Sequence, residues 1–319
     1  MPSRGCPVTG PSVVACAGVP ITACDPLTAA RIVRDGAVAH RVSGVDVHLC
    51  NAYTLALADA DPRLHALLRS ASWNFPDGKS VVWANRLTHP RSRLPTERVY
   101  GPDLFRDVFL LGRPAGLRHY LLGSTPDVLA ALQERLHRNY PGALLVGAES
   151  PPFRPLTEPE RRAQRDRIRA CGAQLVWVGL GTPKQDWEAA RLARELPVVA
   201  VAVGAAFDFV AGTKRQAPLW MQRHGLEWCY RLVQEPRRLW RRYLFGNARF
   251  GYAVVSRAVA GWAVGWLATL GRAAGRWAVG RRPVGRGTVG RGTVGERAVG
   301  RRAGRRRAGR RRAGGHRRR

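Results

Sequence analysis

Short, nearly continuous apolar runs separated by helical patterns are the feature that most restricts how this chain can fold. Residues 175–180 read LVWVGL and residues 198–203 read VVAVAV. Strands that are apolar on both faces are typical of a parallel sheet with helices on each side. The pattern therefore predicts an α/β fold, with a Rossmann-like, mostly parallel sheet flanked by helices.

The same reading assigns an element to most of the chain between residues 19 and 243. We expect strands at 45–49, 119–122, 143–147, 174–179 and 198–203, and helices at 25–38, 52–70, 80–87, 128–140, 158–171 and 185–195. Residues 74–78, which read NFPDG, are predicted to form a turn.

Three polar turns follow expected strands, at 123–127, 179–185 and 204–208. Ligands of parallel α/β sheets bind at the carboxyl ends of the strands. The helices that follow the first two turns begin there, and a helix N-terminus offers free N–H groups and a partial positive charge. We therefore expect a site for an anionic ligand, such as a phosphate, at this edge.

Charge and composition divide the 319 residues into four parts. These are a flexible N-terminal arm (1–18), an α/β core (19–222), a helical appendage next to a membrane (223–271) and a disordered basic tail (272–319). The tail holds eighteen arginines and one glutamate, a net +17 of the +31 that the chain carries. It is either a solvated tail without specific chemistry or a segment that binds membrane or nucleic acid.

The remaining composition favours a cytoplasmic protein. The six cysteines are scattered, as in a reducing compartment, and no Cys/His cluster has metal spacing. The N-terminal residues do not resemble a signal peptide, and the apolar run at 258–271 is shorter than the roughly 20 residues that span a bilayer. Asp59-Ala60-Asp61 could form a metal clamp, but Asp61-Pro62 is better explained as a helix start.

An ordered series of motifs resembles the WecG/TagA/CpsF family of bacterial glycosyltransferases (glycosyltransferase family 26). The matching segments are Asn51, FPDG at 75–78, ERV-x-G at 97–101, LGS at 122–124, YPG at 140–142, GLG-x-PKQ at 179–185, FDF-x-x-G at 207–212, AP at 217–218, GLEW at 225–228, YR at 230–231, EP at 235–236 and R-x-x-RRY at 238–243. The resemblance extends over roughly residues 19–250.

This resemblance implies a reaction and its partners. The family transfers a sugar, often of N-acetylmannosamine type, from a UDP-sugar to a polyprenyl-diphosphate-linked sugar at the inner membrane face. The transfer inverts the glycosidic bond, and no metal or other cofactor is implied. The expected partners are thus the UDP-sugar donor, the lipid-linked acceptor and an anionic membrane surface, with homo-oligomer formation left open and nucleic acid unfavoured.

The resemblance also implies roles for individual residues. Asp77 is the candidate general base and Arg98 the candidate stabiliser of the leaving group. The substrate-binding candidates are Asn51, Gly123, Lys184, Gln185, Asp208, Arg231, Arg238 and Arg241. Simpler explanations stay open at this stage: a turn-forming aspartate for Asp77, a surface pair with Glu97 for Arg98, a helix cap for Asp208, a solvated Lys184 and a soluble basic helix for the appendage.

Of the departures from the family pattern, the one at position 49 matters most; Asp186 in place of the usual Glu, and Gly204-Ala205-Ala206 in place of a more glycine-rich segment, are milder. The family usually has Thr-x-Asn where this chain has Leu49-Cys50-Asn51, so no hydroxyl is available at position 49. Two other kinds of function remain as alternatives. The chain could be a nucleic-acid-binding protein driven by its basic tail, or an inactive accessory protein. A nucleotide-dependent oxidoreductase is disfavoured because Gly179-Leu180-Gly181 lacks the third glycine of the dinucleotide fingerprint.

Overall fold

The computed structural model describes residues 11–39 and 42–279, with side chains as far as residue 260. Contacts along the chain separate a first unit, which ends at Leu267, from a second unit that begins at Ala268. Of the second unit only the helical backbone to Val279 is described. The predicted basic tail therefore lies almost entirely outside the described residues.

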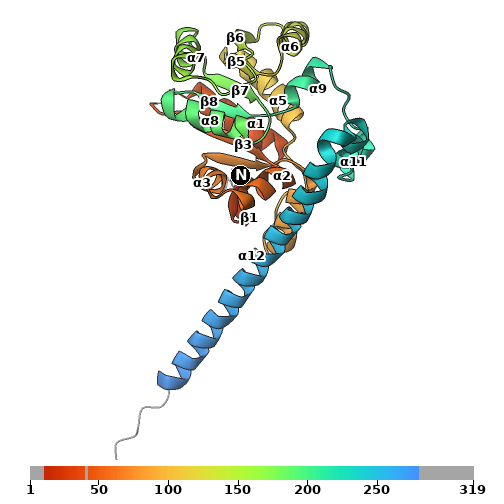
Figure 1. The fold of residues 1–319 in the computed structure, drawn as a ribbon. Coiled ribbons are helices and arrows are strands. Elements are labelled where there is room, and N and C mark those ends of the chain that lie inside the picture. The colour runs from red at the N-terminus through yellow and green to blue at the C-terminus, as the bar shows by residue number, and fades with distance from the viewer. Residues whose placement is uncertain (1–10, 40–41, 280–319) are drawn as a thin grey trace, which may run out of the picture. The chain divides into compact units, whose positions relative to one another are not determined.

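A six-stranded, all-parallel sheet forms the centre of the first unit (Figure 1). Its order is β4 (Trp73–Pro76), β3 (Val45–Cys50), β8 (Val199–Ala202), β7 (Leu175–Gly179), β5 (Arg118–Gly123) and β6 (Leu144–Glu149). The two apolar runs form the neighbouring strands β7 and β8, whose residues from Leu175 to Val178 and from Val199 to Ala202 are buried. The predicted Rossmann-like α/β fold is thus confirmed.

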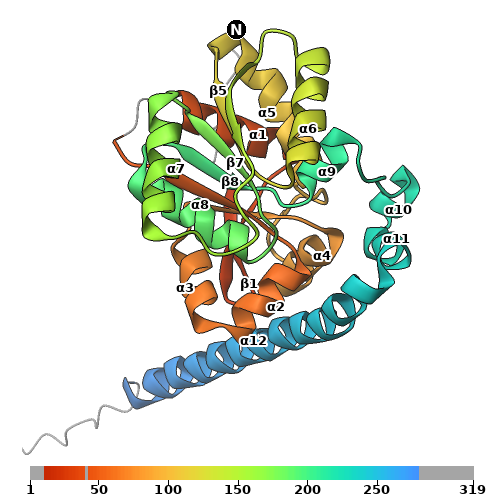
Figure 2. The same cartoon turned by 45° about the horizontal axis from the view of Figure 1, so that its top comes forward.

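Helices cover both faces of the sheet, because successive side chains of each strand point to opposite sides. On one face, Trp177 and Val201 pack with helices α1 (Pro26–Val38), α5 (Gly101–Gly112), α6 (Pro126–Asn139) and α9 (Ala206–Ala211). On the other face, Val176 and Ala200 pack with α7 (Glu158–Ala170) and α8 (Lys184–Glu195) (Figure 2). A 3₁₀ turn, η1 (Arg113–Ala115), follows α5.

Residues 12–18, which we expected within a flexible arm, instead form half of a β-hairpin. Strand β1 (Ser12–Cys16) pairs antiparallel with β2 (Val19–Ala23) through a turn at Ala17-Gly18, where both residues have positive φ. Cys16, Val19 and Ile21 are buried in a hydrophobic cluster, and this burial explains the order of the segment. The rest of the predicted arm, residues 1–10, lies outside the described residues.

Two further segments differ from the sequence-based expectation. The stretch expected as one helix from 52 to 70 is two helices, α2 (Ala52–Ala60) and α3 (Pro62–Ser70), because Asp61 ends the first and caps the second. The predicted turn at 74–78 begins as the edge strand β4. An edge strand tolerates the proline at its end, Pro76, since that residue has no N–H to pair. Helix α4 (Lys79–Thr88) follows, as expected.

The C-terminal appendage, predicted from residue 223, is helical, as expected, and contains α11 (Glu227–Gln234) and α12 (Pro236–Val279). A short helix, α10 (Leu219–Arg223), comes directly before it. Phe250, Ala253 and Val254 of α12 pack into the cluster that contains α2 and the hairpin. Asp59 on α2 forms ion pairs with Arg249 (3.0 Å) and Arg257 (2.6 Å). These contacts hold the first part of α12 against the core, so its arginines have a defined place near the sheet edge.

Candidate active site

Two cavities meet at the carboxyl edge of the sheet. The larger has a volume of about 900 Å³ and lies over the turns that follow β5, β7 and β8. The smaller, of about 340 Å³, lies between α4 and the appendage. Five residues line both cavities: Asn51, Asp77, Tyr100, Arg231 and Arg242. The wall between the cavities is therefore polar and charged.

Asp77 is held in this wall by the end of β4 and the neighbouring strand. Its backbone N–H donates to the carbonyl of Cys50 (2.9 Å), and Asn51 Nδ2 donates to its Oδ2 (3.4 Å). Burial raises the pKa of Asp77, Arg98 and Arg231 oppose that rise, and Glu227 adds to it. A carboxylate whose proton affinity is raised, and which opens to two cavities, is suited to accept a proton.

Asn51 serves the fold as well as the site. Its Oδ1 accepts from the backbone N–H groups of Tyr53 and Thr54, each at 3.1 Å, and so caps α2. That leaves its Nδ2 to orient Asp77. Asn51 also lines both cavities, and its predicted contact with a sugar stays a prediction.

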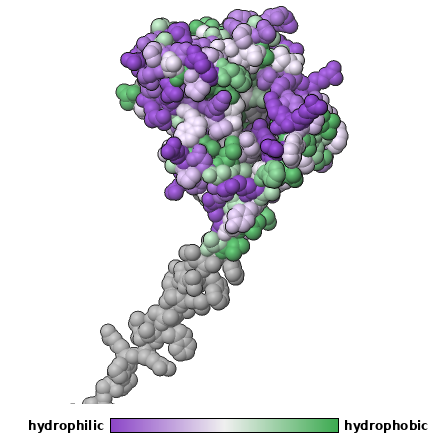
Figure 3. Space-filling model, in the orientation of Figure 1, coloured by the Kyte–Doolittle hydropathy of each residue, from purple (hydrophilic) through white to green (hydrophobic). Residues whose placement is uncertain are grey.

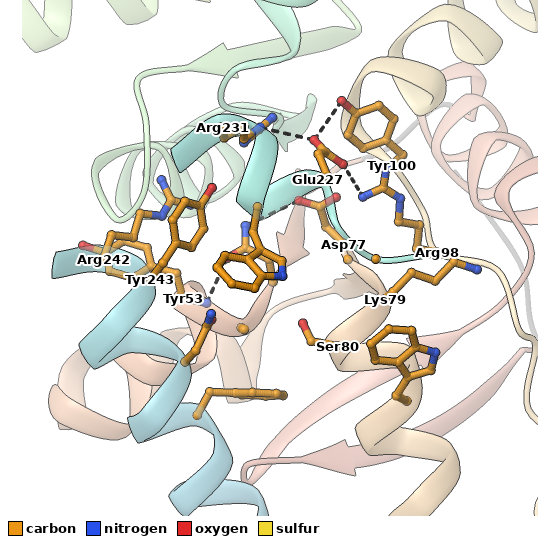
Figure 4. A pocket seen from close by; sticks show the side chains of 18 residues that line it. Tyr53, Asp77, Lys79, Ser80, Arg98, Tyr100, Glu227, Arg231, Arg242 and Tyr243 are labelled. Carbon is orange, nitrogen blue, oxygen red and sulfur yellow. Dashed lines mark hydrogen bonds and ion pairs between the residues drawn. The ribbon is translucent and has the colours of Figure 1, made fainter. Parts of the chain in front are cut away.

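Glu227, at the start of α11, joins the core to the appendage (Figure 4). Its Oε2 lies 2.6 Å from Arg98 Nη1, its Oε1 lies 3.2 Å from Arg231 Nε, and it accepts from the hydroxyl of Tyr100 (3.1 Å). Arg98 also stacks on the ring of Tyr100, with 4.1 Å from Cζ to the ring centroid. Arg98 therefore pairs with Glu227 rather than with its neighbour Glu97, and the alternative of a simple surface pair is wrong.

Sequence reasoning missed Glu227 and Tyr100. Both fall inside motifs that carry the family resemblance, but their motif positions give no sign that they meet, since 127 residues separate them. Arg98 lines only the smaller cavity. Its guanidinium thus lies on the side of the wall away from the turns after β7 and β8.

The predicted substrate-binding residues of the strand turns mostly reach the larger cavity. Lys184, Gln185 and Asp208 line it. Gln185 is buried, its Oε1 has no hydrogen-bond partner among the described residues, and a ligand hydroxyl could donate to it. Lys184 Nζ lies 5.4 Å from the ring centroid of Phe153, whose side chain is almost fully exposed beside the cavity.

Gly123 and Leu49 bear on the site in other ways. Gly123 lines neither cavity; a Cβ there would come within 2.6 Å of the backbone of Gly179, so the glycine permits two strands to approach closely. Leu49 lines the larger cavity as a buried apolar side chain, where the family usually has a hydroxyl.

The three predicted appendage arginines have different surroundings. Arg231 lines both cavities, and Arg238 lines the larger one while pairing with Glu235 (2.7 Å). Arg241 lines neither and is exposed, with its Cζ 5.2 Å from the ring centroid of Trp240. Arg242, which was not among the predicted site residues, takes a place in the wall.

A second buried ionic cluster lies beneath the site, between β3 and α8. His48 is fully buried and lies 3.0 Å from Asp186 Oδ1 through Nδ1 and 3.0 Å from Asp46 Oδ2 through Nε2. Burial alone would lower the pKa of His48, but the bonds to Asp186 and Asp46 outweigh it and raise the value to about 9. The cluster fixes the first turn of α8, which carries Gln185.

Among the described residues, no group of three or more His, Cys, Asp or Glu side chains is arranged to hold a metal ion. The two aspartates of Asp59-Ala60-Asp61 make structural contacts in this structure. Asp59 pairs with two arginines of α12, and Asp61 caps α3 with its side chain on the N–H of Arg63 (2.8 Å). The helix-start reading of this motif is therefore confirmed.

Helix α10 and the appendage carry many large apolar side chains on their surface. They are Leu219, Trp220, Leu226, Trp228, Val233, Trp240, Leu244, Phe245, Tyr252, Val255 and Val259. In Figure 3, hydrophobic residues gather at the end of the core where α12 emerges, below a mainly hydrophilic surface. In the part of the chain that is described, no helix is long and apolar enough to cross a membrane.

A comparison with protein-family models agrees with this architecture. Residues 14–263 match the model described as the glycosyl transferase WecG/TagA/CpsF family. The match includes the sheet, the hairpin from Val14 onward, both cavities and the appendage helices as far as residue 263. The chain belongs to the WecG/TagA/CpsF family and is a glycosyltransferase of cell-surface glycan synthesis.

Proposed function

We propose that this protein is an inverting transferase that moves a hexose or N-acetylhexosamine, with N-acetylmannosamine favoured, from a UDP-sugar to a polyprenyl-diphosphate-linked sugar. The observation that carries the proposal is the position of Asp77 in the wall between two cavities. A single displacement needs a base with the donor on one side and the acceptor on the other.

The larger cavity suits the donor. It lies at the carboxyl edge of the parallel sheet, where nucleotides bind in such folds. Gln185 and Asp208 offer hydrogen-bonding groups for sugar hydroxyls, and Lys184, Arg231 and Arg238 offer positive charge for phosphate.

The smaller cavity suits the acceptor. Its lining combines polar groups with the rings of Tyr53, Trp83, Trp228, Tyr243 and Phe250. Aromatic rings pack well against sugars and lipid, and the appendage adds further exposed aromatic and aliphatic side chains. An arrangement of this kind fits a peripheral protein at the inner face of the plasma membrane, whose basic residues attract anionic lipids.

The proposed step is a direct displacement at the anomeric carbon. The acceptor hydroxyl oxygen bonds to that carbon on the face opposite the UDP, while the bond from the carbon to the phosphate oxygen breaks. Asp77 takes the hydroxyl proton, and UDP leaves with the bonding electrons. Arg98 and Arg231 oppose the rise in the pKa of Asp77, and so help to keep it ionised as a base. The step uses no metal ion.

A UDP-release assay over a panel of UDP-sugars, with a lipid-diphosphate-sugar acceptor, tests the proposal. We expect release to depend on the acceptor and to be fastest with one N-acetylhexosamine donor, together with an acceptor that gains the mass of one sugar. The absence of release with every pair would contradict a transferase role and favour an accessory protein.

A further inference from the structure

Arg242 differs from Arg98, Arg231 and Arg238 because it has no carboxylate partner. Arg161 and Arg194 also line the larger cavity without such a partner, but both of these side chains are exposed. Arg98 and Arg231 both pair with Glu227, and Arg238 pairs with Glu235. Among the described residues, no carboxylate lies within salt-bridge distance of Arg242, although its side chain lines both cavities. A guanidinium built into a cavity wall without a counter-charge is an anion receptor.

The surroundings of Arg242 leave its hydrogen-bonding edge free. Its Cζ lies 4.3 Å from the ring centroid of Tyr53 and 6.0 Å from that of Tyr243 (Figure 4). Both rings lie within cation–π distance of the guanidinium, and its N–H groups make no hydrogen bond among the described residues. Its Nε is buried and has no hydrogen-bond partner among the described residues.

The charge balance of the wall agrees with this reading. Arg98, Arg231 and Arg242 face two carboxylates, those of Asp77 and Glu227. Glu227 is shared by the first two arginines, and Asp77 is hydrogen-bonded to Asn51. Among these three arginines, the one without a paired carboxylate is therefore Arg242. Lys79, a further cation that lines the smaller cavity, donates to the carbonyl of Thr96 (2.9 Å). Burial lowers the pKa of Arg242, and the nearby Arg231 adds to that effect, so an anionic ligand would relieve a real cost.

We propose that Arg242, and not the neighbouring Arg241, is the appendage arginine that binds a substrate diphosphate at the junction of the two cavities. The inference rests on the proposed function. Its chemistry is the bidentate contact of a guanidinium edge with phosphate oxygens, where charge grows as UDP departs. The diphosphate of the lipid-linked acceptor has the same chemistry, and Arg242 lines that cavity as well.

The matched pair Arg242→Gln and Arg241→Gln tests the inference. Both variants remove one positive charge from adjacent positions of α12, so a loss that came from the net charge of the helix would appear in both. UDP and uridine binding are measured by calorimetry, and the KM for the lipid-diphosphate acceptor by UDP release. Because uridine lacks the diphosphate, its affinity should be the same in all variants.

We expect Arg242→Gln to weaken UDP binding by about 10- to 100-fold, the range for losing a charged hydrogen bond, with Arg241→Gln close to the unaltered protein. If the diphosphate is that of the acceptor, the KM for the acceptor rises by this factor and UDP affinity stays constant. Arg242→Lys keeps the charge without the fork and should restore only part of the loss.

Two results would overturn the inference while leaving the proposed function intact. One is an Arg242→Gln protein with unaltered UDP affinity and acceptor KM. The other is an equal loss in both glutamine variants, or a parallel loss of uridine binding, which would indicate general charge or a folding defect. Failure of the unaltered protein to bind UDP or to release it would instead remove the proposed function itself, and this inference with it.

Discussion

Two ionic clusters lie near the candidate site, and they are built differently. Beneath α8, His48 lies between Asp46 and Asp186, and each of its ring nitrogens has a carboxylate at 3.0 Å. In the cavity wall, Asp77 opens to two cavities and Arg242 has no carboxylate partner among the described residues. Both ring nitrogens of His48 are thus paired within the protein, although Asp186 Oδ2 has no hydrogen-bond partner among the described residues. Arg242 has no comparable pairing.

The difference teaches how to separate structural charge from functional charge. A buried group whose partners are complete contributes to stability and needs no ligand. A group that is desolvated without full compensation costs stability and is kept where a substrate completes it. Variants of the first cluster should therefore change mainly unfolding, and variants of the second mainly turnover.

The largest effect is expected from Asp77→Asn. Loss of a positioned base should lower turnover by about 10²–10⁴-fold. The amide has the same shape and removes a buried charge, so the melting temperature should stay the same or rise. Steady-state UDP release and thermal unfolding of the same preparation check both parts. A folded Asp77→Asn protein with near-normal turnover would remove Asp77 from the role of base.

A smaller loss is expected from Glu227→Gln. Arg98 and Arg231 would lose the carboxylate that places them, and turnover should fall by about 10- to 100-fold. The charge of Glu227 also raises the pKa of Asp77. In the unaltered protein, therefore, the acidic limb of kcat/KM should lie above the ordinary value of 3.8. In Glu227→Gln it should move to lower pH.

Glu235→Gln is the matched control for this variant. Glu235 pairs with Lys214 and Arg238 at the edge of the larger cavity, in a more exposed place than Glu227. Turnover should change by no more than about fivefold, the upper range for exposed pairs. A Glu227→Gln protein with an unmoved acidic limb would show that Glu227 does not act on Asp77.

The smallest effect on turnover is expected from His48→Asn. This substitution should act mainly on the free energy of unfolding. Breaking a buried ionic contact should lower the free energy of unfolding by about 3 kcal/mol near pH 6. Because folding raises the pKa of His48 to about 9, its stabilisation is complete below 6.5 and is lost as the pH rises through 9. Denaturant titrations across this range should show that decline in the unaltered protein and not in His48→Asn. An identical decline in the unaltered protein and in His48→Asn would contradict the assignment of this pH dependence to His48.

The sequence predicts the sheet better than it predicts the site. Continuous apolar runs such as 175–180 predict strands of a parallel sheet, because such a run can be recognised without knowing which distant residues pack against it. The edge strand β4 was missed because Asn-Phe-Pro-Asp-Gly has the composition of a turn. The hairpin was missed because Ala17-Gly18 is an uncommon pair for a turn with positive φ at both residues.

Within the site, the position of a residue around its helix determines whether its side chain faces the cavities, and the sequence alone does not predict this. Arg241 and Arg242 are equivalent by composition, yet one residue turns the side chain by about 100° around the helix axis. The tertiary contacts of α12, through Phe250 and Ala253 and through the ion pairs of Asp59, determine which arginine faces the cavities. The pairing of Glu227 with Arg98 depends in the same way on a tertiary contact.

The structure of the protein with UDP bound tests the central claim most directly, namely that the wall at Asp77 separates a donor cavity from an acceptor cavity. The account predicts the nucleotide in the larger cavity, with its diphosphate beside Arg242 and its terminal phosphate toward Asp77. A nucleotide in the smaller cavity, among Trp83, Trp228 and Phe250, would contradict the assignment of both cavities.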